Sequence, residues 1–236
     1  MGVIKHFLTI NGKSTEDFNI WISGEATFAS PRRRYTNVHV DGRNGDLTFD
    51  DEDFENIDVS YPAFITRGFQ SNISDFEDFC GALSGYVRIE DTYHPDEYRM
   101  GIFKGSVKPK TTAANLAGDF TIDFDCQPQR WLKEGERAVK FTSNGVIKNP
   151  TNQKAKPLIR VYGTGSVGVG DTTITISSVD EYVDIDCETM DAYKGSVNCN
   201  ANISVTNHKF PVLAGDTNIS LTGVTRVEII PRWWRA

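Results

Sequence analysis

The sequence predicts an all-β protein built from two domains. Apolar residues alternate with polar ones over many short stretches, a single stretch has helical spacing, and a polar, proline-containing stretch interrupts the pattern near the middle of the chain. A period of two places successive side chains on opposite faces of a strand, so that one face is buried and the other is solvated. With 236 residues, the chain is long enough for two small domains.

The first half contains the clearest strand, in which Phe120, Ile122, Phe124 and Cys126 alternate with polar residues. We predict further strands at 3–10, 17–22, 34–40, 46–50, 57–67, 86–90 and 98–107. Pro62 cannot donate to a ladder, and it indicates a break or an edge in the strand over 57–67. Between 34–40 and 46–50, Asp41-Gly42 and Asn44-Gly45 tolerate positive φ, which favours a tight hairpin.

One helix is predicted between these strands. Ser74 followed by Glu77 forms a capping box, and Gly85 suits the C-terminal cap, so we expect the helix to begin at Ser74 and to end near Gly85. The apolar residues at helical spacing, which we assign to the core, are Phe76, Phe79, Cys80 and Leu83.

The stretch 127–157 is polar, carries three prolines and loses the alternation, which is typical of a connection between domains. We place the boundary near 130–150 and expect domains at 1–140 and 141–236. Beyond it, strands are predicted at 157–163, 172–177, 180–187, 194–206, 216–221 and 224–230. Short, closely spaced strands without a convincing helix favour an antiparallel sandwich.

Composition excludes several classes of protein. The formal net charge of −7 disfavours an extended surface for nucleic acid, although Arg32 to Arg34 and the stretch with Lys104, Lys108 and Lys110 leave a local basic site as an alternative. No apolar run approaches the ~18 residues of a membrane span, and the N-terminus lacks a secretory signal, so we expect a cytoplasmic origin. The four cysteines form no C-x-x-C pair, which favours free, mostly buried thiols.

Three patterns imitate functional motifs. Gly163, Gly165 and Gly168 match G-x-G-x-x-G, but a β-branched stretch follows instead of a helix, so we expect a hairpin or bulge. The acidic run 50–53 offers oxygen ligands for a cation without the spacing of a calcium loop, which favours a solvated loop. The alternating carboxylates Asp184, Asp186 and Glu188 resemble a glycosidase pair, although an exposed strand face is the simpler interpretation.

No pattern of nucleophile and base supports an enzyme. The histidines at 6, 39, 94 and 208 are scattered, and neither G-x-S-x-G nor S-x-x-K occurs. We therefore predict no catalytic residues, no metal site and no cofactor. An all-β chain without an active site is typical of a binding protein or a structural protein. Assembly into a closed ring is one way to cover exposed strand edges.

Longer segments resemble a known family. In the first half these are PRRRYTNVHVDGRNGDLTFDDEDFENIDVSYP, YRMGIFKGSV and FTIDFDCQPQRWL, and in the second half NPTNQKAKPLIRVYGTG, EYVDIDCETMDAYKG, FPVLAGDTNISLTG and VEIIPRWW. In this order they resemble the distal tail protein (Dit) of long-tailed, non-contractile phages that infect Gram-positive bacteria. The resemblance spans nearly the whole chain.

The resemblance implies an N-terminal split β-barrel with one flanking helix, related to tail-tube folds, and a C-terminal galectin-like β-sandwich. It further implies a homo-hexameric ring at the virion tail tip, assembled in the host cytoplasm, without a cofactor and without membrane insertion. The implied partners are the tail tube protein, the tape measure protein, a tail-associated lysin or fibre protein and a receptor-binding protein. DNA would pass transiently through the ring without specific binding.

Two sets of residues are candidates for these contacts. Basic residues before the hairpin would meet the acidic run of a neighbouring subunit, unless both runs simply face solvent. This candidate ring interface comprises Arg32, Arg33, Arg34, Arg43, Asp50, Asp51 and Asp53. Trp131, Trp233 and Trp234 carry large apolar area, and we predict that they dock the C-terminal tail against the first domain.

The alternative function is a carbohydrate-binding adhesion module that contacts host cell-wall polysaccharide. A galectin-like sandwich is compatible with it, and Trp233 or Tyr193 would then stack on a sugar ring. Fold alone does not carry function, so the ring hub remains the preferred prediction.

Overall fold

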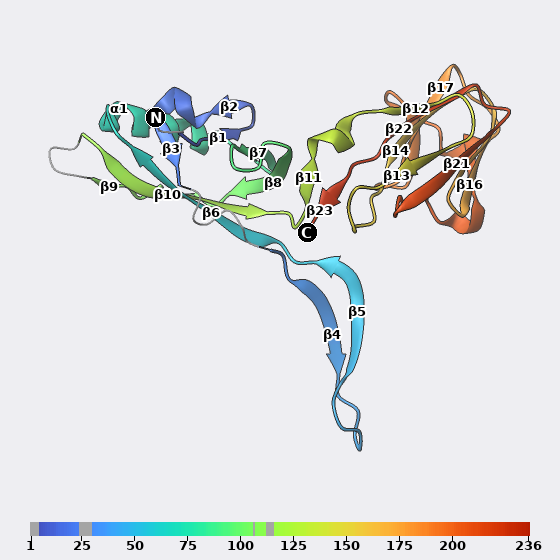
Figure 1. Ribbon diagram of the computed structural model, residues 1–236, viewed down its shortest axis with the longest axis horizontal. Helices are drawn as coiled ribbons and strands as arrows, with labels where there is room; N and C mark the ends of the chain where they lie inside the picture. The colour runs from blue at the N-terminus through green and yellow to red at the C-terminus, as the bar shows by residue number, and fades with distance from the viewer. Residues whose placement is uncertain (1–4, 24–29, 106, 112–115) are drawn as a thin grey trace. The chain divides into compact units, whose positions relative to one another are not determined.

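The computed structural model describes residues 5–23, 30–105, 107–111 and 116–236, which form two compact units (Figure 1). Unit 1 extends to Arg130 and includes Ala236, and unit 2 comprises Trp131–Arg235. Each unit has its own hydrophobic core. Residues 131–140 belong to unit 2.

Unit 1 is a curled antiparallel sheet with the strand order β2-β1-β7-β8-β10-β6-β3. Its strands are β1 (Leu8–Ile10), β2 (Lys13–Ser14), β3 (Ile20–Ile22), β6 (Ile57–Ile65), β7 (Val87–Asp91), β8 (Glu97–Phe103), β9 (Lys110–Thr111) and β10 (Gly118–Cys126). The short 3₁₀ helix η1 (Thr15–Phe18) precedes β3.

The two ends of this sheet meet, which makes it a split barrel. The amide of Ile22 at the end of β3 donates to the carbonyl of His6, just before β1, at 2.8 Å. On the other side, β10 pairs with β8 over only three residues, and its first two residues pair with β9 instead. The barrel is therefore closed at one place and open at another, and the predicted all-β fold with a split barrel is confirmed.

The core of unit 1 lies on one face of β10 and β6. Residues of β10 alternate between buried and outward positions, and Phe124 and Cys126 are fully buried, as the period of two predicts. The predicted break at Pro62 is wrong, because β6 runs through it and pairs with β10 along its whole length. The Pro62 carbonyl accepts a hydrogen bond from the amide of Ser23, which follows β3. The nitrogen and the carbonyl of one residue in an antiparallel strand point to the same neighbouring strand. The nitrogen of Pro62 therefore faces the β3 side, and its missing N–H removes no hydrogen bond to β10.

The helix α1 (Phe69–Gly81) begins five residues earlier than predicted. Its N-cap is Gly68, whose φ of 62° suits glycine, and Ser74 lies inside the helix, where its hydroxyl donates to the Gln70 carbonyl at 3.1 Å. The C-cap is Ala82 rather than Gly85. The predicted core face is confirmed: Phe76 and Cys80 are buried, and Phe79 and Leu83 pack against the same core.

The strands β4 (Arg33–Val38) and β5 (Leu47–Phe54) form a two-stranded sheet of their own, shown in light blue in Figure 1. The predicted hairpin is thus present. Gly42 and Gly45 in the connecting turn have φ of 77° and 79°. Glu52, with φ of 58°, lies where the register shifts in a β-bulge.

Unit 2 is a sandwich of two antiparallel sheets, as predicted. The six-stranded sheet has the order β12-β22-β14-β17-β18-β19, and the five-stranded sheet has the order β13-β21-β15-β16-β20. The six strands are β12 (Val139–Phe141), β22 (Arg226–Ile230), β14 (Leu158–Tyr162), β17 (Tyr182–Asp186), β18 (Asp191–Lys194) and β19 (Val197–Asn198). The five are β13 (Gly145–Lys148), β21 (Asp216–Thr222), β15 (Gly165–Val169), β16 (Thr172–Ile176) and β20 (Ile203–Val205).

Outside these two sheets, β11 (Arg130–Leu132) pairs with β23 (Trp234–Arg235). The 3₁₀ helices of this unit are η4 (Lys133–Glu136), η5 (Asn200–Asn202) and η6 (Thr206–His208). The predicted strand over 194–206 is interrupted by η5, and the stretch 127–157 contains β12 and β13. Gly165 and Gly168 of the glycine motif lie in β15, which forms the expected hairpin with β16, and Gly163 precedes this strand.

Candidate functional site

The hairpin of β4 and β5 carries the candidate ring residues, and it pairs several of them within the chain. Arg33 contacts Asp50 at 2.7 Å, and Arg34 contacts Asp53 at 3.2 Å. The hydrogen bond to Asp50 raises the pKa of Arg33, and in turn it lowers the pKa of Asp50. These ion pairs are solvent-exposed, so they contribute little stability and are weakened by salt.

Three candidates are not involved in these ion pairs. Asp51 accepts a hydrogen bond from the Thr36 hydroxyl at 3.2 Å. The guanidinium groups of Arg32 and Arg43 contact no acidic side chain within the described part of the chain. Arg32 and Arg43 are thus the cations of the candidate interface that are free to meet another subunit.

One face of the hairpin is apolar, which the charge pattern did not indicate. The register places Thr36 opposite Phe49 and Val38 opposite Leu47, so Val38, Leu47 and Phe49 share a face. Val38 is 43% exposed and Phe49 is 51% exposed. Among the residues that the structure describes, none covers this apolar face or pairs with the two outer edges of the hairpin, so the hairpin is suited to pairing with another protein surface.

Two of the three tryptophan candidates are held by contacts inside unit 2. Trp233 is buried in the core of this unit, and its carbonyl accepts from the amide of Leu132 at 2.8 Å. Trp234 packs against the same core, and its indole donates to the Lys154 carbonyl at 3.0 Å. Trp131, on β11, is half-buried. Stacking of Trp233 on a sugar is excluded by its burial, and docking of the segment onto the first domain stays a prediction.

The alternating carboxylates of β17 lie buried instead of exposed. Asp184 accepts two hydrogen bonds from Arg160, at 2.6 and 2.8 Å. Asp186 accepts two from Arg232, both at 2.8 Å. Arg160 lies on β14 of the same sheet, and Arg232 lies near the end of the chain. Because an arginine holds each carboxylate, the two carboxylates are structural, and the resemblance to a glycosidase site is not supported.

We expect unit 2 to lose stability in acid through Asp186. The hydrogen bonds from Arg232 lower the pKa of Asp186. A carboxyl whose pKa is lower in the folded state adds stability above its unfolded pKa of about 4, and this stability is lost as pH falls through the folded value. Urea unfolding at pH 7 and at pH 3 measures the loss. Asp186→Asn should show a smaller difference between the two, and an unchanged difference would contradict the assignment.

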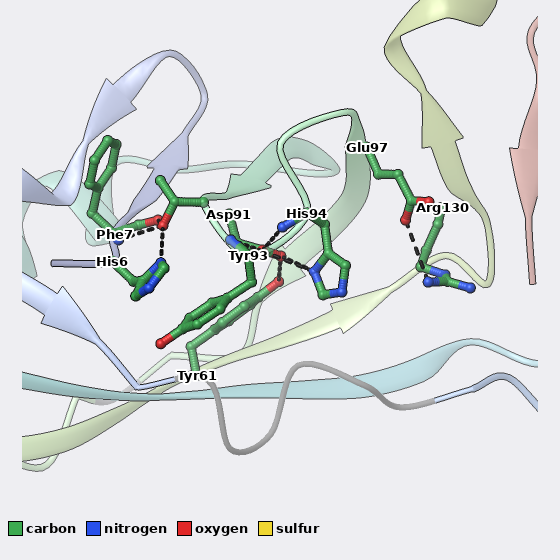
Figure 2. Close-up of polar contacts among 9 residues, drawn as sticks. His6, Phe7, Tyr61, Asp91, Tyr93, His94, Glu97 and Arg130 are labelled. Carbon is green, nitrogen blue, oxygen red and sulfur yellow. Dashed lines mark hydrogen bonds and ion pairs between the residues drawn. The ribbon is translucent and has the colours of Figure 1, made fainter. Parts of the chain in front are cut away.

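A second polar cluster forms the turn after β7, as Figure 2 shows. Asp91 accepts from the amides of Tyr93 and His94, at 2.9 and 2.8 Å, and lies 3.0 Å from the His94 ring nitrogen. The Tyr61 hydroxyl donates to the same carboxylate at 3.4 Å, and burial followed by the charge of Asp91 raises the pKa of Tyr61. These contacts close an Asx-type turn, which is a structural role.

The same turn contacts His6, which is far from it in sequence. His6 stacks on Tyr93 with ring centroids 3.8 Å apart, and its Nδ1 lies 3.0 Å from the Thr92 hydroxyl. Sequence reasoning missed this cluster because His6 and His94 are separated by most of unit 1. Its only sequence signal is the Asp91-Thr92 pair at a strand end.

Three of the four cysteines are buried thiols. Cys80, Cys126 and Cys187 are buried, and desolvation raises the pKa of each thiol to about 12. Within residues 5–23, 30–105, 107–111 and 116–236, no three His, Cys, Asp or Glu side chains are grouped so as to hold a metal ion. Over the same residues, no helix has the length and apolar character to cross a membrane.

Over the described residues, unit 1 is a split barrel with the helix α1 and unit 2 is a two-sheet sandwich, an all-β fold like that of a Dit protein of known structure. The solved structure of SPP1 Dit (gp 19.1), described as a paradigm of the hub adsorption apparatus of phages that infect Gram-positive bacteria, is similar with a TM-score of 0.74 and 11% identity. The similarity covers 95% of this chain and 97% of SPP1 Dit.

Two structures of the phage P2 baseplate in its activated conformation are also similar. The one with Ca has a TM-score of 0.52 and the one with Sr has 0.50, both at 11% identity. They cover 96% and 97% of this chain, and 97% of each baseplate chain. No protein-family model and no curated protein sequence matches this chain.

Proposed function

We propose that this chain is the hub subunit of a phage tail tip, assembled in the host cytoplasm as a hexameric ring. The observation that carries the proposal is the similarity to SPP1 Dit, a hub protein, over nearly the full length of both chains. The matched length includes both units, so the proposal concerns the whole chain and not one shared domain. The role is structural, without a catalytic step.

The hairpin is the element that we assign to contacts between subunits. Its apolar face supports this assignment, because burying Val38 and Phe49 against a neighbour would remove exposed apolar area from water. Arg32 and Arg43 would add charge contacts to acidic groups of the neighbour. Arg33, Arg34, Asp50 and Asp53 are already paired with one another across the hairpin, so they are less available to a neighbouring subunit. A contact of this head-to-tail kind closes into a ring when the rotation permits.

The remaining partners follow from a position between the tail tube and the host-recognition apparatus. They are the tail tube protein, the tape measure protein, a tail-associated lysin or fibre protein and a receptor-binding protein. The charge supports transient DNA passage, because −7 per chain gives −42 for six chains. A ring of that charge repels DNA rather than retaining it.

The purified wild-type chain tests this proposal. We expect mass photometry to give a particle of six times 26.3 kDa, and negative-stain micrographs to show sixfold rings with a central hole. A particle of twelve chains would be two stacked rings and would also support the ring. A monomer that persists at high concentration would contradict it.

A further inference from the structure

Unit 2 contains a pocket that lies outside the hairpin assigned to subunit contacts. It has a volume of about 460 Å³, within the range of about 300–1,000 Å³ typical of small-molecule sites. Its walls come from the turn between β15 and β16, the start of β21, and the segment 206–214 that begins with η6; β16 and β21 are labelled in Figure 1. The pocket therefore lies at one end of the five-stranded sheet.

Hydrogen bonds hold these walls in place. The Thr206 hydroxyl donates to the Thr173 carbonyl at 3.1 Å, which ties η6 to β16. The amide of Gly170 donates to the Asn218 carbonyl at 2.9 Å, which ties the turn to β21. The Thr217 hydroxyl bonds the backbone of Ala214 at 3.3 Å. A pocket with walls fixed in this way needs little ordering when a ligand enters.

Five of the polar side chains that line the pocket are not used by the fold. They make no hydrogen bond or ion pair with any residue that the structure describes, and they offer two carboxylates, two amides and one ammonium group. These side chains are Asp171, Asp216, Asn207, Asn218 and Lys209. Carboxylates accept hydrogen bonds, and each amide both donates and accepts.

Phe210 provides the apolar part of the pocket. Its side chain is only half-buried and packs against the core of unit 2, so the ring is anchored on one side and open on the other. An aromatic ring beside uncommitted donors and acceptors matches a pyranose, which has an apolar C–H face and hydroxyls around its edge. The formal charge of the lining is −1, which disfavours an anionic ligand.

We infer that this pocket binds a neutral saccharide unit, with Phe210 against the sugar face and Asp171, Asp216, Asn207 and Asn218 on its hydroxyls. Lys209 donates to a ring or hydroxyl oxygen. The inference adds a ligand to the proposed hub subunit and does not require the ring. It differs in place from the stacking on Trp233 or Tyr193 that the sequence suggested.

Saturation-transfer NMR of the full chain tests the inference with glucose, galactose, N-acetylglucosamine and glucuronic acid as probes. We expect at least one neutral sugar to bind with a dissociation constant on the order of 1 mM, the range in which this method detects binding. Glucuronic acid should bind more weakly than that sugar. Mass photometry on the same samples records the ring, so that failure of sugar binding and failure of the hub proposal are separate results.

Substitutions inside and outside the pocket test whether the sugar binds there. Asn218→Ala removes an exposed side chain that no other described residue bonds, so folding should be unaffected while affinity falls about fivefold. Phe210→Ala should reduce affinity at least tenfold, and circular dichroism checks that it folds. Tyr193→Ala, an aromatic residue outside the pocket, is the matched control and should bind normally. No binding of any neutral sugar, unchanged affinity in Asn218→Ala, or loss of binding in Tyr193→Ala would overturn the inference.

Discussion

Replacing Val38 and Phe49 together by aspartate is expected to abolish the proposed ring and to leave the chain folded. Both side chains are exposed on the same face of the hairpin, and neither belongs to the core of unit 1. A charge introduced into a contact that excludes water is left without a partner, which is strongly unfavourable. Mass photometry should therefore show the variant at 26.3 kDa, one sixth of the mass expected for the wild type.

Two controls separate burial of this face from charge. Val146→Asp introduces the same charge at a valine of unit 2 that is 57% exposed, and it should assemble normally. Val38→Ser with Phe49→Ser removes the apolar area without adding charge, and it should weaken assembly at low concentration. The hairpin assignment fails if the double aspartate variant forms rings like those of the wild type.

Trp233→Ala is expected to reduce the free energy of unfolding of unit 2 by about 3–5 kcal/mol, the range for truncating a large buried aromatic side chain. Trp233 is only 4% exposed and belongs to the core of unit 2. Any side chain at Gly135 would overlap the Trp233 backbone, so the chain end lies tightly against η4. The cavity left by alanine cannot easily collapse there.

The neighbouring residue supplies the matched control. Trp234 is half-exposed, and its indole makes one hydrogen bond, to Lys154. Trp234→Ala removes the same side chain from a less buried position, so its effect on urea unfolding should be about 1 kcal/mol, close to the value of one hydrogen bond. Equal losses for the two variants would mean that Trp233 does not act through core burial.

Several local signals in the sequence predicted the structure correctly. The alternation along 120–126, the glycines of the 41–45 turn and the helical spacing of Phe76 and Cys80 each depend on residues close in sequence. Other local signals predicted the wrong position. The capping box at Ser74 is not used, because Gly68, with a φ of 62°, is the N-cap and the helix begins five residues earlier.

The candidate sites were harder to predict than the fold. The carboxylates Asp184 and Asp186 are on one strand face as expected, yet they are buried because Arg160 and Arg232 reach them from elsewhere in the chain. The pairing of Arg33 with Asp50 depends on the hairpin register and its bulge, which alternation does not specify. The saccharide pocket is assembled from three segments that share no motif.

The sequence by itself determined the all-β class, the core face of the helix α1 and the sandwich of the second half, because these follow from residue periods and turn residues within short windows. Tertiary structure alone decided how the barrel closes, where His6 meets Ile22, and which charges are paired within the chain. It also decided that Trp233 is core and that Asn218 lines a pocket. The physical reason is that burial and ion pairing depend on contacts between residues distant in sequence, and only the packed chain specifies those contacts.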